Sequence, residues 1–430
     1  MGTQADVDSA QGRAGHARTL AERLREALSG APVVILGGAR QVGKSTLAQD
    51  PSIGGGRRYL TLDHLPTLDR ALRAPEALVA AGGRLTIDEV QRAPDLMIAV
   101  KHVVDRVKQD GQFLLTGSAN LLLARTSGES LAGRARYLTL HPFTPRELRR
   151  EPGSAPWGGA LLSAPDAESA AGLLATTPSA SPRAFDWRGH ALRGGFPPAA
   201  LAARDTDRIQ WFEDYATTYL RRDLRELAQV DDLAGFGRLL RLAALRTGGL
   251  LNQSELGRDA GLARSTTMRW MSLIEASYLA SLVPPWHSTR SKRLVRAPKL
   301  YPTDTGLALH LAGVHDADGL ESLPRPGVWL EALVRNDLAS WAETATPRPG
   351  LYHYRTSSGA EIDFLLEQGR RVLPIEVKSN ASLRTEEGRA IEAFCDEHGR
   401  QAPFGLVLHD GDELLPLTNR VLGVPLCSVL

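Results

Sequence analysis

Short apolar runs alternate with helical patterns through the first third of the 430-residue chain. The runs are VVIL, RRYLTLD, RLTIDEV, QFLLTGS and ARYLTL, and helical spacing of Leu20, Leu24 and Leu28 precedes the first of them. This alternation is typical of a mostly parallel sheet with helices on both faces. Residues 29–150 are therefore predicted to form an α/β core, after a loose tail and first helix over residues 1–28.

The pattern changes after this core. Residues 151–204 are rich in Ala, Ser, Pro and Gly, and we interpret them as a flexible insertion with weak helical pieces. Residues 205–248 show helical stretches and predict a helical lid. Residues 249–315 predict a short helix, a turn at Gly261, a longer helix from about Ser265 to Glu275 and a strand at Tyr278–Val283, the order of a winged-helix domain. Residues 325–430 begin with a helical pattern, continue through strands, and predict a second α/β domain.

Composition narrows the class of protein. Apolar residues make up 43% and charged residues 23% of the chain, as in soluble globular proteins, and the net charge of +2 leaves any nucleic-acid site to local clustering. Two cysteines, Cys395 and Cys427, exclude a disulfide framework, and no Cys/His spacing resembles a zinc site. The sequence shows no apolar signal segment and no run of roughly 20 apolar residues. We therefore expect a cytoplasmic protein that does not contact a membrane.

A phosphate-binding loop is predicted between the first strand and the helix that follows it. The segment GARQVGKS matches G-x-x-x-x-G-K-[ST] at every fixed position. Backbone amides of such a loop surround phosphate oxygens, Lys44 is placed to reach the β and γ phosphates of ATP, and the Ser45 hydroxyl to ligate Mg²⁺. The predicted nucleotide-binding residues are Gly38, Ala39, Arg40, Gln41, Val42, Gly43, Lys44, Ser45 and Thr46.

Adjacent acids at the end of the strand RLTIDEV complete the predicted hydrolytic site. Asp88 is placed to contact Mg²⁺, and Glu89 to act as the base that activates water. The strand QFLLTGSAN ends in Thr116, Ser118 and Asn120, any of which can orient that water, and we favour Ser118. An ordinary turn at the end of a strand is the alternative reading of these polar residues.

A second group of acids lies in EIDFLLEQGRRVLPIEVKS. Alternation places Glu376 and Lys378 on one face of a strand, and a hairpin through EQGRR brings Asp363 beside them. Carboxylate oxygens are the ligands that Mg²⁺ or Mn²⁺ prefers, so Asp363 and Glu376, with Glu331 from the preceding helix, predict a metal site for attack on a phosphodiester. Only six of the 51 basic residues are lysines, and Lys44 and Lys378 are two of them, which favours a chemical role for Lys378. A surface salt-bridge cluster is the alternative.

Basic residues gather in the predicted winged-helix domain. Residues 252–300 carry a net charge of +5, and the segment STRSKRLVRAPK falls where a wing would lie. The eight basic residues are Arg258, Arg264, Arg269, Arg290, Lys292, Arg293, Arg296 and Lys299. These side chains predict a salt-dependent contact with DNA, while a plain packing module remains equally open.

Several motifs together resemble AAA-type ATP-binding proteins that bear a carboxy-terminal domain of unknown function numbered 4143. They are GARQVGKST, LTIDEVQ, LLTGSANLLL, SLAGRARYLTLHPFTPREL, GGFPPA and YLRRDL. The resemblance implies a homo-oligomer in which an arginine completes a neighbouring subunit's site; Arg134 is the candidate, with Arg222 behind it, and a structural salt bridge is the alternative. The downstream acids resemble the PD-(D/E)xK nuclease core, although Ile362 stands where that pattern has proline, and they imply a restriction-endonuclease-like α/β domain. A decayed nuclease fold is a further alternative.

These patterns support three hypotheses of function. The first is Mg²⁺-dependent ATP hydrolysis coupled to DNA binding and to metal-dependent DNA cleavage. The second is a nucleotide-controlled switch or scaffold, whose nuclease-like domain binds DNA or another partner without cutting it. The third is a DNA motor of the branch-migration type, in which DNA raises ATP turnover without strand scission.

Overall fold

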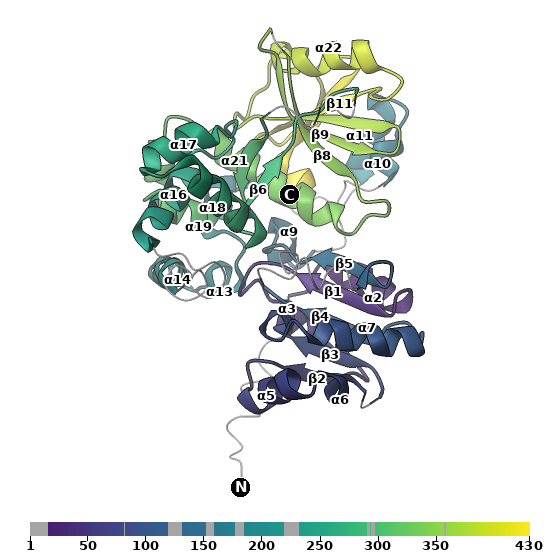
Figure 1. Cartoon of the computed structure of the whole chain (residues 1–430). Coiled ribbons are helices and arrows are strands. Elements are labelled where there is room, and N and C mark those ends of the chain that lie inside the picture. The colour runs from purple at the N-terminus through teal and green to yellow at the C-terminus, as the bar shows by residue number, and fades with distance from the viewer. Residues whose placement is uncertain are drawn as a thin grey trace.

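The computed structural model describes residues 16–80, 82–118, 131–151, 159–176, 185–218, 232–289, 293, 297–356 and 358–430. Two sheets lie at opposite ends of the molecule, and a group of helices lies to one side between them (Figure 1). Within the described residues, no helix combines the length and the apolar character needed to cross a membrane.

The first sheet confirms the predicted α/β core. All five strands are parallel and run in the order β2-β3-β4-β1-β5. Their bounds are β1 Val33–Gly37, β2 Arg58–Thr61, β3 Leu85–Asp88, β4 Phe113–Thr116 and β5 Ala135–Thr139. Val33 and Ile35 enter one apolar core, and Val34 and Leu36 enter another, because successive side chains of a strand point to opposite faces. The sheet is therefore covered on both faces, as the alternating pattern predicted.

Helices of the core follow the strands and cover these two faces. Helix α7 supplies Leu96, Val100 and Val104 to the core that holds Val33 and Ile35, and α2 supplies Leu20 and Leu24 to the other. The helices are α2 Leu20–Ser29, α3 Lys44–Gln49, α4 Pro51–Gly54, α5 Leu65–Arg73, α6 Pro75–Val79, α7 Leu96–Arg106 and α9 Pro145–Leu148.

Helices and a two-stranded sheet form the central part of the chain. Helices α17 and α18 are joined at Gly261, which has φ 69°, and β6 then pairs antiparallel with β7. The helix–turn–helix–strand order expected for residues 249–315 is present, and Trp270 and Met271 are buried in its core. The elements are α12 Trp187–Arg193, α13 Pro197–Ala200, α14 Asp205–Thr218, α16 Leu233–Leu245, α17 Gln253–Ala260, α18 Arg264–Ala276, β6 Ala280–Val283, β7 Lys299–Pro302, α19 Thr305–Leu311 and α20 Ala317–Glu321.

The second sheet has six strands in the order β12-β13-β11-β10-β9-β8. Strands β9 and β10 form the predicted hairpin, and β10, β11 and β13 are parallel to one another. Helix α21 crosses from this sheet toward the first domain, and α22 covers the sheet's other side (Figure 1). The elements are α21 Gly327–Ala342, β8 Gly350–Arg355, β9 Glu361–Gln368, β10 Arg371–Val377, η6 Thr385–Gly388, α22 Arg389–His398, β11 Gly405–His409, β12 Leu415–Pro416, β13 Val421–Pro425 and α23 Leu426–Val429.

One expectation for the insertion is corrected by the structure. Helices α10 (Gly159–Ser163) and α11 (Ala167–Thr176) pack on β10 and β13 of the second sheet. Leu161, Leu162 and Leu174 are buried in the same core as that sheet. Apolar burial thus fixes residues 159–176 as part of the carboxy-terminal domain rather than as a loose insertion.

Candidate functional site

The phosphate-binding loop joins β1 to α3. Gly38 has φ 148° and Gly43 has φ 100°, a region of backbone conformation that favours glycine. A Cβ on Gly38 would lie 2.4 Å from the carbonyl oxygen of Leu140, so only glycine fits there. Ala39 and Val42 are buried, and their side chains pack in the core that also holds Val34 and Leu36.

Lys44 is buried at the first turn of α3. Its Nζ donates hydrogen bonds to the carbonyl oxygens of Gly38 (3.0 Å) and Ala39 (2.8 Å). Burial lowers the pKa of the Lys44 amine to about 8, although Glu89 and Asp88 act in the opposite direction. A phosphate bound at the loop would therefore favour the charged form of the Lys44 amine.

Asp88 accepts hydrogen bonds from three hydroxyl groups. The Ser45 hydroxyl lies 2.9 Å from Oδ2, Tyr59 donates to Oδ2 at 2.6 Å, and Thr116 donates to Oδ1. The two residues predicted to contact Mg²⁺, Ser45 and Asp88, thus lie together at the carboxyl edge of the parallel sheet. A hydroxyl and a carboxylate are suitable oxygen donors for Mg²⁺, so this pair fits the ion. The roles of Tyr59 and Thr116 beside Asp88 were not predicted.

Glu89 has the left-handed backbone conformation, with φ 59° and ψ 42°. Burial raises the pKa of its carboxyl group, and Lys44 opposes that shift. The Gln91 amide donates to Glu89, and it lies 3.1 Å from the Ser118 hydroxyl, which is itself 3.4 Å from the Glu89 carboxylate. The structure therefore brings together Glu89 and Ser118, the predicted base and water-orienting residue, and adds Gln91 between them. Asn120 lies outside the described residues.

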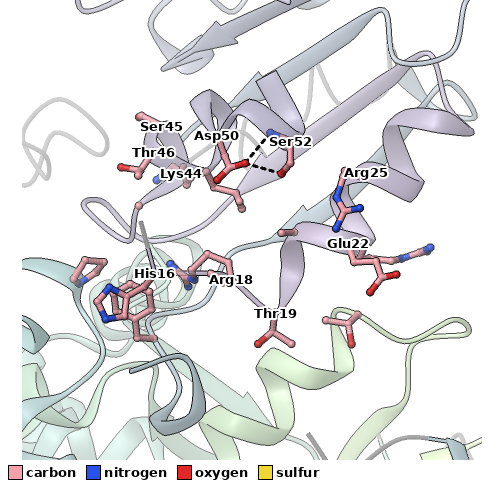
Figure 2. A pocket seen from close by; sticks show the side chains of 18 of the residues that line it. His16, Arg18, Thr19, Glu22, Arg25, Lys44, Ser45, Thr46, Asp50 and Ser52 are labelled. Atoms are coloured by element: carbon pink, nitrogen blue, oxygen red, sulfur yellow. Dashed lines mark hydrogen bonds between the residues drawn. The ribbon is translucent and has the colours of Figure 1, made fainter. Parts of the chain in front are cut away.

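A cavity of about 1460 Å³ lies against the loop. Figure 2 shows Lys44, Ser45 and Thr46 on one side of it and His16, Arg18 and Thr19 on the other. Arg18 is buried and fixes the start of α2 beneath the loop: it pairs with Glu147 at 3.2 Å and donates to the carbonyl oxygens of Val42 and His141. No sequence motif pointed to a role for Arg18.

The carboxy-terminal domain also contributes to this cavity. Trp341, at the end of α21, and Thr344, just after it, line the cavity wall. Nearby, Glu343 accepts a hydrogen bond of 3.4 Å from the Thr139 amide at the end of β5. Arg146 of α9 donates to the carbonyl oxygens of Val429 (3.1 Å) and Ser428 (2.8 Å). The two domains thus share the wall of the candidate nucleotide site.

Arg134 lies at the amino ends of the parallel strands, opposite the carboxyl ends where the phosphate-binding loop lies. It directly precedes β5, whereas the phosphate-binding loop follows β1, and the two strands are parallel. Its guanidinium pairs with both oxygens of Asp105. Within this chain the structure therefore shows the salt bridge that was the alternative reading, and Arg134 is not part of the loop's own site. Arg222 lies outside the described residues.

The predicted acids of the carboxy-terminal domain do meet. Asp363 on β9 lies beside Glu376 on β10, because the Asp363 amide donates to Glu376 (3.3 Å) and the Val377 amide donates to Asp363 (2.9 Å). The Lys378 Nζ lies 2.7 Å from Glu376 Oε1. Burial, and then Asp363, raise the pKa of Glu331 to about 7 and that of Glu376 to about 8. We call Glu331, Glu361, Asp363 and Glu376 the acid cluster.

Lys299 enters this cluster from β7. It is 3% exposed, and its Nζ lies 2.6 Å from Glu361, 3.0 Å from Glu331 and 3.5 Å from Asp363. The amine occupies the position at which a metal would contact these carboxylates, so the cluster as arranged does not fit the predicted Mg²⁺ or Mn²⁺ ion. In the described part of the chain, no group of three His, Cys, Asp or Glu side chains is arranged to hold a metal ion.

The predicted basic surface is smaller than the sequence suggested. Lys299 and Arg293 are buried, and Arg293 pairs with Glu367 while it stacks on Trp286 and Tyr352. Arg293 and Lys299 neutralise carboxylates inside the protein instead of facing solvent. The local sequence pattern does not show these partners, because they are distant in sequence. Arg258, Arg264 and Arg269 are exposed on α17 and α18. Arg290, Lys292 and Arg296 lie outside the described residues.

Comparison with known proteins assigns three regions of the chain. Residues 30–149 match the AAA domain, residues 184–318 match the domain of unknown function DUF8612, and residues 326–428 match the domain of unknown function DUF4143. These boundaries place the phosphate-binding loop in the first region, Lys299 in the second and the acid cluster in the third.

Relatives cover nearly the whole chain. The uncharacterized proteins Rv2008c of Mycobacterium tuberculosis and Mb2031c of Mycobacterium bovis are each 32% identical over 415 residues, which is 96% of this chain and 84% of theirs. Among solved structures, the Walker-type ATPase PABY2304 of Pyrococcus abyssi is 13% identical with a TM-score of 0.39, covering 68% of this chain and 94% of that one. A RuvB variant of Thermotoga maritima is 19% identical with a TM-score of 0.28, covering 64% and 93%. The chain belongs to the family of proteins that join an AAA domain of the P-loop ATPase type to a carboxy-terminal DUF4143 domain.

Proposed function

We propose that the chain hydrolyses ATP in a Mg²⁺-dependent reaction at the phosphate-binding loop. The observation that carries this proposal is the meeting of Lys44, Ser45, Asp88 and Glu89 at one edge of the parallel sheet. Lys44 binds the phosphates, Ser45 and Asp88 hold the ion, and Glu89 takes a proton from the attacking water. The ion, when bound, neutralises charge on the phosphate oxygens. Ser118 and Gln91 keep the Glu89 carboxylate oriented.

Nucleotide occupancy, we further propose, is transmitted to the carboxy-terminal domain through α21. This helix has Glu331 of the acid cluster near its first turn and Trp341 at the nucleotide cavity. Ten residues of helix separate them, or about 15 Å at 1.5 Å per residue. A nucleotide that displaces Trp341 therefore acts on the helix that carries Glu331 of the acid cluster. This arrangement favours the nucleotide-controlled switch over an ATPase that works alone.

DNA binding and DNA cleavage would take place on different parts of the chain. Exposed Arg258, Arg264 and Arg269 on α17 and α18 support a DNA contact, because positive side chains neutralise phosphates. Cleavage by the DUF4143 domain would require Lys299 to leave the acid cluster first. The branch-migration motor stays a third proposal, and the homo-oligomer a proposal that depends on Arg134.

One assay panel separates these functions. ATP turnover is measured with no DNA and with single-stranded, duplex and junction DNA, and the same reactions are scored for nicking in Mg²⁺ and in Mn²⁺. Lys44→Ala should remove ATP turnover, while Lys108→Ala, a change at an exposed lysine, should leave it intact. Wild-type turnover in the Lys44→Ala protein would overturn the ATPase proposal. Nicking that Asp363→Ala removes would establish the nuclease, and DNA-stimulated turnover without nicking would favour the motor.

A further inference from the structure

Lys299 brings a positive charge from one domain into a group of acids that belongs to another. Its ammonium has three carboxylate neighbours, on Glu331, Glu361 and Asp363, all within 3.5 Å. The side chain is buried, and a buried ammonium is stable only where opposite charges pair with it. The ammonium is thus surrounded by oxygen ligands in the manner of a bound cation.

Strand β7 holds this lysine against the cluster. Tyr301, two residues further along the same face of the strand, donates its hydroxyl hydrogen to Glu331. The chain before β7 is attached to β8, since the Trp286 amide donates to the His353 carbonyl (2.6 Å) and the His353 amide donates to the Pro284 carbonyl (3.0 Å). Arg293 pairs with Glu367 close by. Residues 284–286, Arg293 and residues 299–301 therefore contact the DUF4143 domain close to the acids.

The negative charge of the acid cluster requires a cation where the Lys299 ammonium lies. Glu331 and Asp363 are buried carboxylates, and buried charges are costly unless they are paired. Lys378 pairs with Glu376 and leaves the Glu331 side of the cluster to Lys299. An ammonium and a divalent cation repel each other strongly at such short range, so the two exclude one another.

We propose that Lys299 is the built-in cation of the acid cluster, which it closes to divalent metal for as long as β7 stays on the DUF4143 domain. The contact is autoinhibitory: the carboxylates can exchange Lys299 for Mg²⁺ or Mn²⁺ only after residues 299–301 withdraw. This proposal concerns the acid cluster alone and does not depend on ATP hydrolysis.

Mn²⁺ binding to the nucleotide-free full-length protein tests the proposal, measured by isothermal titration and by the paramagnetic resonance of free Mn²⁺. The wild-type protein should show no Mn²⁺ site that depends on Asp363, so Asp363→Asn should leave its Mn²⁺ binding unchanged. Lys299→Met should gain one Mn²⁺ site, with a Kd on the order of 100-fold below the highest Mn²⁺ concentration at which wild type shows none, because a unit charge is removed beside the carboxylates. Lys299→Met/Asp363→Asn should lose this site, whereas Asp88→Asn in the Lys299→Met background should keep it.

Two further variants keep the outcome interpretable. Lys108→Met removes an exposed lysine and should bind Mn²⁺ as wild type does. If Lys299→Met does not fold, Lys299→Met/Glu361→Gln removes one charge of each sign and leaves Glu331 and Asp363 as ligands. An Asp363-dependent Mn²⁺ site in the wild-type protein would overturn the proposal, and so would the absence of any gain in a folded Lys299 variant.

Discussion

The Tyr59 hydroxyl donates a 2.6 Å hydrogen bond to Oδ2 of Asp88, the same oxygen that lies 2.9 Å from the Ser45 hydroxyl. Tyr59 comes from β2, at the edge of the sheet, and reaches a carboxylate on its neighbour β3. The proposed Mg²⁺ contact is thereby oriented by a residue that does not itself contact the ion. Groups that orient metal ligands in this way often matter nearly as much as the ligands.

Tyr59→Phe should weaken the dependence of ATP turnover on Mg²⁺ without removing nucleotide binding. The Asp88 carboxylate keeps its position in β3 but loses one orienting donor, so we expect the half-saturating Mg²⁺ concentration to rise about 10-fold. A titration of turnover against Mg²⁺ at saturating ATP measures this. Tyr137→Phe, a matched change at an exposed tyrosine of β5, should follow the wild-type curve. A Tyr59→Phe curve that coincides with wild type would remove this role.

ATP binding should be accompanied by proton uptake near pH 8. Because burial lowers the pKa of Lys44 to about 8, roughly half of the amines are neutral at that pH before phosphate arrives. Phosphate favours the charged form, so binding should take up about half a proton at pH 8 and almost none at about pH 6.5. Calorimetry in buffers of different ionisation enthalpy measures the difference. Equal uptake at the two pH values would contradict it.

The lowered pKa of Lys44 should also make the free energy of unfolding depend on pH. Since the pKa of Lys44 is below its ordinary value of 10.5, the amine lowers the free energy of unfolding below about pH 8, where it is charged in both states. That cost disappears as the pH rises toward 10.5. Lys44→Met should therefore raise the stability of the nucleotide-free protein at pH 7 more than at pH 10. Denaturant unfolding at both pH values checks the sign.

Thr344→Trp should block nucleotide binding from the carboxy-terminal domain. The larger side chain would fill part of the cavity wall while Lys44, Ser45 and Asp88 stay unchanged. We expect ATP affinity to fall by about tenfold or more, equivalent to ~1.4 kcal/mol. Fluorescent nucleotide titration measures the affinity, and Ser169→Trp on the exposed side of α11 serves as the control. Unchanged affinity would place the nucleotide away from α21.

Arg134 and Asp105 offer a test of subunit completion. If Arg134 acts only in its salt bridge, Arg134→Ala and Asp105→Asn should have the same small effect, since partly exposed ion pairs contribute little. If Arg134 completes a neighbour's site, as we propose, Arg134→Ala alone should reduce turnover by roughly 1000-fold. Mixing the Arg134→Ala and Lys44→Ala proteins should then restore part of the activity. Equal loss in the two salt-bridge variants would support the structural role.

The acid cluster should make stability depend on pH. Burial and Asp363 raise the pKa of Glu376 to about 8, above its ordinary value of 4.5, so the folded protein binds more protons than the unfolded chain between these values. The free energy of unfolding should therefore fall as the pH rises through this window, by at most about 1.4 kcal/mol per pH unit for one proton. Glu376→Gln should flatten that slope, and Glu397→Gln, at an exposed position, should not. Parallel slopes for wild type and Glu376→Gln would show that another group carries the dependence.

Sequence periodicity was sufficient to predict those elements that depend on a single strand, loop or hairpin. The strands of the first sheet, the loop from Gly38 to Ser45 and the hairpin that pairs Asp363 with Glu376 all depend on local alternation and on residues close in sequence. Each element therefore carried its own signal. The meeting of Ser45 with Asp88 could also be predicted, because parallel strands bring their carboxyl ends to one edge.

Contacts between distant segments could not be predicted in this way. Lys299 looked like a surface cation because its neighbours in sequence are basic, yet its partners lie 32 to 64 residues away, on α21 and β9. Arg18 and Trp341 likewise acquire their positions at the cavity only from tertiary packing. The Ala-rich insertion was misread for the same reason, since its few leucines become core only once the second sheet exists.

The position of Trp341 and Thr344 on the cavity wall has a consequence for biosynthesis. The ribosome releases the Gly38–Ser45 loop and all five strands of the first sheet long before it adds α21. A nascent chain therefore has the phosphate-binding loop before it has the cavity wall formed by Trp341 and Thr344. Only translation of α21 and of the two residues after it supplies that side, so a product that terminates before α21 would bind nucleotide poorly.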